Sequence, residues 1–385
     1  MFNVEDYAND PRVSVSAGDD TSDTGGTNAD TFLDPSDLIA TFSNGTDDDA
    51  NGYVDDIAGW DFFDDDNDPY DASSCCSANG HGSGRAKEAL AQTDNGVGET
   101  GMCPKCQLMP LRIWDSFVPP TDNWALALTY AADNGASVAE GAIGGLTNTR
   151  FARSAVRYAD GKGMALMLVS SDINSANHNY PTNYNQAIYV AGSFPDTAPN
   201  NTCSGPGGLP GFGDVFNLPP EFEEGCQQLL QSLSGIGVTP TTQPFTTSFF
   251  RNSNLTQYGG KADIVLMGTT GSENTGQAAG VAGLLESYAH TTFARSQFPA
   301  GLSGNETRQL LTKTAEDVLP QNTGSIGLPD KARPGWDPHF GYGRVDLAAA
   351  MSRIRLKNGQ PIPAGWPCGT RRTCIPPEAQ IDAPD

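Results

Sequence analysis

Gly268-Thr-Thr-Gly-Ser272-Glu-Asn-Thr-Gly276-Gln-Ala-Ala-Gly280-Val-Ala-Gly-Leu-Leu285 joins a glycine-rich turn to a run of small and apolar residues. This pattern predicts a helix whose first turn carries Ser272. Unpaired backbone N–H groups and the positive end of the helix dipole lie there, and both stabilise a developing oxyanion. Serine is also a common helix N-cap. Ser272 is therefore a candidate nucleophile if the chain supplies a base.

The chain has four histidines: His81, His178, His290 and His339. The last three stand in segments typical of loops or helix ends. His81 lies between two glycines, and a helical pattern follows it. Because glycine allows close approach of substrate and a helix start fixes the ring, His81 is the expected base.

These segments resemble the subtilases, the subtilisin-like serine peptidases. Gly80-His81-Gly82-Ser83 is similar to the family's Gly-His-Gly-Thr motif, although its usual second histidine is replaced by Arg85 or a neighbour. Counting back from the helix's Ala279-Gly280 pair identifies Ser272 as the family's serine, with Gly271 in place of its threonine and Gly276 in place of its proline. Further similar segments follow the family's order: residues 101–115, 134–145, 180–193, 258–265 and 340–350.

The resemblance implies a substrate strand and an oxyanion residue. Ile143 and Gly144 follow a segment similar to the strand that binds the substrate backbone by β-strand addition. Asp172 stands nearest to the position of the family's oxyanion asparagine, and Asn174 is an offset alternative. An aspartate can donate a hydrogen bond only when protonated. A loop aspartate with no such role is the other interpretation of Asp172.

The triad aspartate has one literal counterpart, Asp23 in Asp23-Thr-Gly. No apolar run precedes it, whereas a core strand buried on both faces reads as one. Residues 2–7 resemble the tail of a calcium loop, residues 375–385 resemble the entry to a β-sandwich, and no secretory signal peptide is present. We therefore expect an internal fragment of a longer secreted peptidase that lacks the aspartate strand.

Composition limits the partners. The net charge of −24 argues against nucleic acid as a partner, because binding to phosphates requires positive charge. No apolar run is long enough to span a membrane. The partner expected is a polypeptide substrate, with the chain acting as a monomer.

An acidic segment predicts calcium. Asp47, Asp49 and Asn51 have the ligand spacing of an EF-hand-like loop, and Gly52 stands at the sharp turn. The Tyr53 carbonyl and Asp55 are further expected ligands, because Ala58 stands where the loop's glutamate usually is. A solvated acidic loop is the alternative.

Eight cysteines form four pairs that are close in sequence, a spacing that suits local disulfides in an extracellular protein. Cys103-Pro-Lys-Cys106 is also compatible with a redox or zinc pair, but its place in the family pattern favours a short disulfide or a small-residue replacement. The pairs are Cys75 with Cys76, Cys103 with Cys106, Cys203 with Cys226, and Cys368 with Cys374.

The fold class implied is α/β, a subtilisin-like three-layer fold with a mostly parallel central sheet flanked by helices. Residues 1–45 are expected to be an irregular acidic lead, 46–353 the peptidase domain with an insertion at 194–250, and 354–385 a linker toward a missing C-terminal domain. Helices are predicted at 84–92, 122–133, 151–162, 276–288 and 303–317.

Two functions remain from the sequence. The first is a serine endopeptidase that hydrolyses peptide bonds through Ser272, His81 and an orienting aspartate. The second is a catalytically silent, calcium-stabilised module that binds peptides or other domains.

Overall fold

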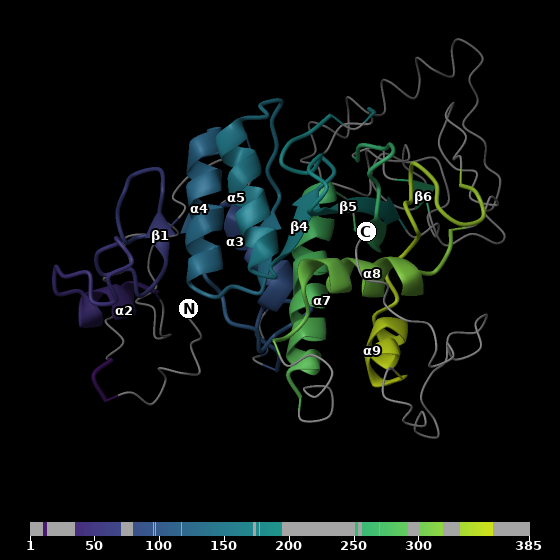
Figure 1. Cartoon of the computed structure of the whole chain (residues 1–385). Coiled ribbons are helices and arrows are strands. Elements are labelled where there is room, and N and C mark those ends of the chain that lie inside the picture. The colour runs from purple at the N-terminus through teal and green to yellow at the C-terminus, as the bar shows by residue number, and fades with distance from the viewer. Residues whose placement is uncertain are drawn as a thin grey trace, which may run out of the picture.

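The computed structural model describes residues 11–13, 35–70, 80–94, 96, 98–116, 118–171, 175–176, 178–194, 251–252, 256–268, 270–291, 300–318 and 332–356. These residues form an α/β architecture in which helices cover both faces of a sheet (Figure 1). The three-layer prediction is thereby confirmed. Nearly all of the predicted insertion at 194–250 and of the predicted linker at 354–385 lies outside the described residues.

The central sheet is mainly parallel. β4 (Ala165–Val169) pairs with β3 (Val138–Gly141) on one side and with β5 (Ala187–Phe194) on the other. β5 also pairs in parallel with β7 (Ile264–Met267), while β6 (Arg251–Asn252) runs antiparallel to the end of β5. Within the described residues, β3 pairs with β4 alone.

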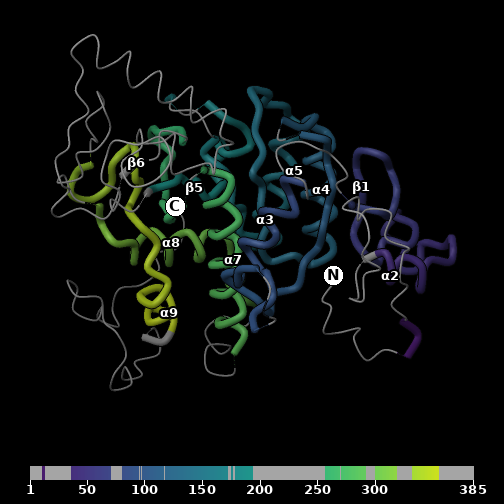
Figure 2. The backbone as a smooth tube through the Cα atoms, turned by 180° about the vertical axis from the view of Figure 1, so that it is seen from behind, coloured from purple at the N-terminus to yellow at the C-terminus, as the bar shows by residue number. Residues whose placement is uncertain are grey.

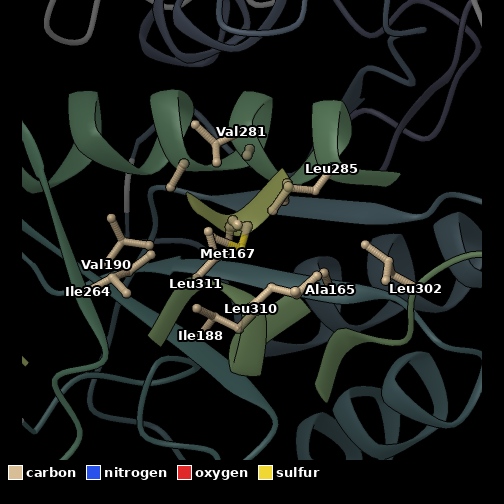
Figure 3. Packing of buried hydrophobic residues seen from close by; sticks show 14 of the residues in the cluster. Ala165, Met167, Ile188, Val190, Ile264, Val281, Leu285, Leu302, Leu310 and Leu311 are labelled. Atoms are coloured by element: carbon tan, nitrogen blue, oxygen red, sulfur yellow. The ribbon is translucent and has the colours of Figure 1, made fainter. Parts of the chain in front are cut away.

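One helical layer consists of α7 (Gly271–Ala289), α8 (Gly304–Thr314) and α9 (Leu347–Leu356). Figure 3 shows Val281 and Leu285 of α7 above side chains of the sheet. Met167 of β4 belongs to this cluster and is fully buried. Alternate residues of β4 therefore face α7, as the two-residue period of a strand requires.

The opposite layer consists of α4 (Thr121–Asp133) and α5 (Arg150–Gly161). Leu166 and Leu168 of β4 point to this side and share a cluster with Trp124 and Val156 of the two helices. Both faces of β4 are thus buried, which explains its continuous apolar sequence.

The N-terminal described segment lies beyond α4 (Figures 1 and 2). It contains β1 (Trp60–Asp61), which pairs in parallel with β2 (Leu111–Arg112), and the helix α2 (Pro35–Phe42). Tyr53 packs edge-on against Tyr130 of α4, with ring centroids 4.9 Å apart. The segment is therefore attached to α4 by aromatic contacts.

Helix α2 lies in the stretch that the sequence analysis expects to be irregular. Pro35 at its first position fits a helix start, and Leu38 is completely buried. Local helix signals within an acidic segment account for this difference. None of the helices in the described ranges combines the length and apolarity needed to cross a membrane.

Candidate active site

Helix α3 (His81–Leu90) packs closely against α7 because α7 presents glycines to it. A β-carbon on Gly276 would stand 2.7 Å from the Arg85 carbonyl oxygen, and one on Gly280 would stand 2.4 Å from that of Ala89. Distances below 3.0 Å leave no room for a side chain. The glycines of the helix-forming stretch therefore allow the backbones to touch.

The same contacts fix the register of α3 and α7. Arg85 and Ala89 are one turn apart on α3, and their partners Gly276 and Gly280 are one turn apart on α7. One turn earlier on each helix are His81 and Ser272. Both residues lie in the first turn of their helix, so the close packing brings them to equivalent levels at the same end of the helix pair.

Ser272 is buried, with 5% of its surface exposed. The Thr270 side chain caps α7 by accepting a hydrogen bond from the Glu273 N–H at 3.1 Å. This cap places the helix start five residues before the predicted range. Ser272 consequently lies at the positive end of a 19-residue helix.

His81 is the first residue of α3, and Gly80 before it has φ of 75°, a backbone conformation that favours glycine. The other histidines have different surroundings. His290 follows α7, about 27 Å along the helix from Ser272 at 1.5 Å per residue. His339 stacks on Tyr258, and the His178 ring contacts the Ala176 carbonyl oxygen.

The expected substrate-binding residues Ile143 and Gly144 follow the end of β3 at Gly141 after one intervening residue. Gly145 next to them exchanges two backbone hydrogen bonds with Tyr180. A β-carbon on Gly144 would stand 2.1 Å from Oδ1 of Asn179, whose Nδ2 lies 3.4 Å from the Ile143 carbonyl oxygen. Asn179 is not among the residues predicted for the site, although an amide next to the Tyr-Pro pair is a signal of a turn.

The remaining predicted catalytic residues lie outside the described residues. This holds for Asp172, for its alternative Asn174 and for Asp23. The described chain reaches Ser171, two residues after the end of β4, where φ is 78°. The chain therefore turns sharply just before Asp172.

Four charged residues of three elements interact near these first turns. On α3, Nε of Arg85 donates to Glu88 at 2.7 Å, and Nη2 donates to the other carboxylate oxygen. Burial lowers the Arg85 pKa, but the Glu88 hydrogen bond and the charges of Glu88, Glu140 and Glu273 outweigh it and raise this pKa overall. Burial, with smaller contributions from the charges of Glu273 and Glu99, raises the pKa of Glu88 although the Arg85 hydrogen bond and charge lower it.

Glu140 lies on β3 and retains contact with solvent. Crowding by protein atoms raises the pKa of Glu140 to about 8, against the charge of Arg85 and with a smaller contribution from Glu88. Water still reaches the carboxylate, so solvent screening keeps the associated change in stability small.

Side-chain oxygens of the acidic loop accept hydrogen bonds from backbone N–H groups of the same loop. Asp47 accepts hydrogen bonds from the N–H groups of Asn51 and Gly52, at 3.1 and 2.8 Å. Asp49 also accepts from the Asn51 N–H, and Asn51 Oδ1 accepts from the N–H of Tyr53. Gly52 has φ of 94°, as the sharp turn requires.

Asp55 points out of this loop. Its two oxygens accept hydrogen bonds from the N–H groups of Asn44 and Gly45, both at 2.7 Å. The next residue, Asp56, instead accepts from Asn51 Nδ2 at 2.8 Å. Across the described ranges, no three His, Cys, Asp or Glu side chains converge as metal ligands would. The oxygen-rich donor set nevertheless suits calcium.

Cys103 and Cys106 form a disulfide in a turn that packs against the C-terminal end of α3. The Cys103 N–H donates to the Ala89 carbonyl at 2.8 Å. Sγ of Cys106 lies 2.9 Å from the position of a β-carbon on Gly283 of α7. The turn therefore contacts the last turn of α3 and the C-terminal half of α7, away from His81 and Ser272. The other six cysteines lie outside the described residues.

Comparison with known proteins identifies related sequences. Residues 13–343 match the Subtilase family (Peptidase_S8). The chain is 36% identical over 138 residues to thermitase of Thermoactinomyces vulgaris, covering 35% of this chain and 47% of thermitase. It is 34% identical over 156 residues to the thermophilic serine proteinase of Bacillus sp. (strain AK1), covering 40% and 37%.

A longer match joins the chain to the cell wall-associated protease of Bacillus subtilis (strain 168). The two are 26% identical over 289 residues, which cover 72% of this chain and 27% of the protease. The chain thus spans less than half the length of each of these three relatives.

Proposed function

Because the chain belongs to the subtilase family, we propose that it is a serine endopeptidase in which Ser272 is the nucleophile and His81 the general base. The observation that carries this proposal is the register of α3 and α7, which brings the two residues to the same level at one end of the helix pair. Residues 46–353 are proposed as the peptidase domain.

In this mechanism, His81 accepts the proton of the Ser272 hydroxyl as its oxygen attacks the peptide carbonyl. The tetrahedral oxyanion forms beside the first turn of α7, where the helix dipole favours negative charge. His81 then returns the proton to the leaving amine, and water hydrolyses the acyl-enzyme by the same steps. Asp172 is the proposed second oxyanion donor and acts in its protonated form.

The substrate is proposed to be a polypeptide bound as an added strand along Ile143 and Gly144. Support comes from β3, which within the described residues pairs with β4 alone. The contact between Gly144 and Asn179 leaves no room for a side chain at position 144. In this proposal the substrate backbone lies along Ile143 and Gly144, and the Asn179 side chain holds these two residues in place.

A fluorophosphonate that esterifies activated serines tests this proposal. We expect stoichiometric labelling of the full chain at Ser272, no labelling of Ser272→Ala, and labelling of His81→Ala slowed by about a thousandfold or more. Ser154→Ala is the matched control, because Ser154 lies on the outer helix α5. An unlabelled wild-type chain would instead favour the catalytically silent module.

We further propose calcium as a stabilising ligand of the acidic loop. Asp47, Asp49, Asn51 and the Tyr53 carbonyl are its ligands in this proposal. Asp56 is a better-placed fifth ligand than Asp55, because it already contacts Asn51 whereas Asp55 binds the backbone outside the loop. Calcium would neutralise the negative charges of Asp47, Asp49 and Asp56, which otherwise repel one another.

An extracellular location is the third proposal. A disulfide such as Cys103–Cys106 persists in oxidising compartments, and one relative is named a cell wall-associated protease. Detection of the disulfide in the natively produced protein, by mass spectrometry after alkylation without reduction, tests it. Alkylated thiols at both positions would contradict it.

A further inference from the structure

Arg85 occupies a central place among the charges near the proposed site. It follows His81 by four residues and therefore lies on the same side of α3. Its side chain is largely buried, with 16% exposed, and so is that of its partner Glu88, with 19% exposed.

The Arg85–Glu88 pair is held between α3 and α7. Both Glu88 oxygens accept hydrogen bonds from Arg85, and Oε2 stands 2.5 Å from the position of a β-carbon on Gly276. The carboxylate therefore lies against the α7 backbone. A proline or an alanine at position 276 would displace it.

Two further carboxylates interact with the same guanidinium. Glu140 lies on β3, just before the proposed substrate strand, and Glu273 follows Ser272 on α7. The charges of both raise the pKa of Arg85. The charges of Glu140 on β3 and Glu273 on α7 thus act on the cation that binds Glu88 on α3.

We propose that Arg85 is a positioning residue that holds His81 level with Ser272 by fixing the Glu88 carboxylate against the α7 backbone. This inference rests on the proposed function. Removal of the guanidinium leaves the largely buried Glu88 carboxylate without its counter-ion beside the Gly276 backbone, and this unpaired charge loosens the packing of the first turns of α3 and α7. Lysine would keep the charge but lose the bidentate contact to Glu88.

The test compares Arg85→Met and Arg85→Lys in the full chain, with kcat and KM measured on a fluorogenic peptide. We expect Arg85→Met to lower kcat by about ten- to a hundredfold with KM changed less than about twofold, because misalignment affects the chemical step. Arg85→Lys should recover part of the loss. Lys162→Gln is the matched control, since it breaks a solvent-exposed pair with Asp133 and should leave both constants unchanged.

A second readout is the titration of the His81 imidazole by NMR. The charged groups of this cluster are Arg85 and Glu88 on α3. The charges of Glu140 on β3 and Glu273 on α7 act on Arg85, and that of Glu99 acts on Glu88. Loss of the positive charge in Arg85→Met should move the titration to higher pH, whereas loss of a negative charge in Glu88→Gln should move it to lower pH. Glu88→Gln also serves if Arg85→Met does not fold.

The outcomes separate the two proposals. A wild-type chain that neither cleaves peptide nor reacts with fluorophosphonate refutes the proposed function, and the His81 titrations then decide the role of Arg85. Unchanged titrations in both variants overturn the inference. A kcat of Arg85→Met within twofold of wild type also overturns it. The same holds if Arg85→Met and Arg85→Lys lower the unfolding temperature equally and leave kcat unchanged.

Discussion

The carbonyl oxygen of Ala89 on α3 lies 2.4 Å from where a β-carbon of Gly280 on α7 would be. This contact joins the middle of the longest described helix to the C-terminal half of α3. Carbonyl groups of a helix are rigid, so neither partner can give way by a change of rotamer. The separation of the two helices, and with it the alignment of His81 and Ser272, is therefore sensitive to one methyl group.

Gly280→Ala should destabilise the protein by about 1–3 kcal/mol, because the added methyl group forces the helices apart. Reactivity of Ser272 with fluorophosphonate should fall as well. Denaturant unfolding and labelling rates measure the two effects. Gly161→Ala at the end of α5 is the matched control, since its β-carbon meets nothing within 4 Å; a loss as large in this variant would refute the argument.

Gly144→Ala should raise KM for peptide substrates about tenfold or more, because its β-carbon would displace Asn179 and with it the proposed substrate strand. The double variant Gly144→Ala/Asn179→Ala removes the collision. We expect it to bind substrate better than Gly144→Ala alone. Additive losses in the double-mutant cycle would show that the two positions act independently.

Glu140→Gln should stabilise the protein at alkaline pH only. The folded-state pKa of Glu140 is about 8, above its usual 4.5, so the folded state holds this proton more tightly than the unfolded state does. Relative to the glutamine variant, wild type therefore loses stability as pH rises from about 4.5 to about 8. Unfolding temperatures should coincide near about pH 4 and differ near about pH 9.

Glu99→Gln provides the control for this pH series, because Glu99 is an exposed carboxylate outside the helices. It should follow wild type throughout. An unfolding temperature for Glu140→Gln that stays below that of wild type near about pH 9 would mean that the ionised carboxylate stabilises the fold.

Chelation should lower the unfolding temperature if the acidic loop binds calcium. Binding of an ion to the folded state alone contributes about 3 kcal/mol when its concentration is a hundred times the Kd. Asp47→Asn should abolish this response, and the Glu99→Gln variant should retain it. Equal unfolding curves with calcium and with chelator would leave a solvated loop whose aspartates bind only its own backbone.

Much of the helical layer was predictable from periodicity. The predicted range 122–133 begins one residue after α4 does and ends at the same residue. The predicted range 151–162 is shifted by one residue from α5. The predicted helix 276–288 begins too late, because α7 starts at Gly271. Thr270 and Glu273 form a recognisable Thr-x-x-Glu signal for this start. The small residues after Ser272 concealed this start, because glycines are weak helix formers.

Contacts between distant segments were not predictable. Nothing in the sequence around Asn179 indicates that its side chain supports Ile143, and nothing around Arg85 indicates that Glu140 and Glu273 interact with it. The orientation of Asp55 likewise depends on Asn44 and Gly45, which precede the loop motif. Such contacts follow from the packing of elements, which a local motif does not encode.

The turn closed by Cys103 and Cys106 has a geometric effect at a distance. Helix α3 has 10 residues, so about 15 Å separate this turn from His81. A tilt of only about 4° about the turn would swing His81 by about 1 Å, a displacement that can slow an enzyme about a hundredfold. The turn closed by the disulfide therefore limits the tilt of α3, and this tilt determines where the imidazole lies at the other end of the helix.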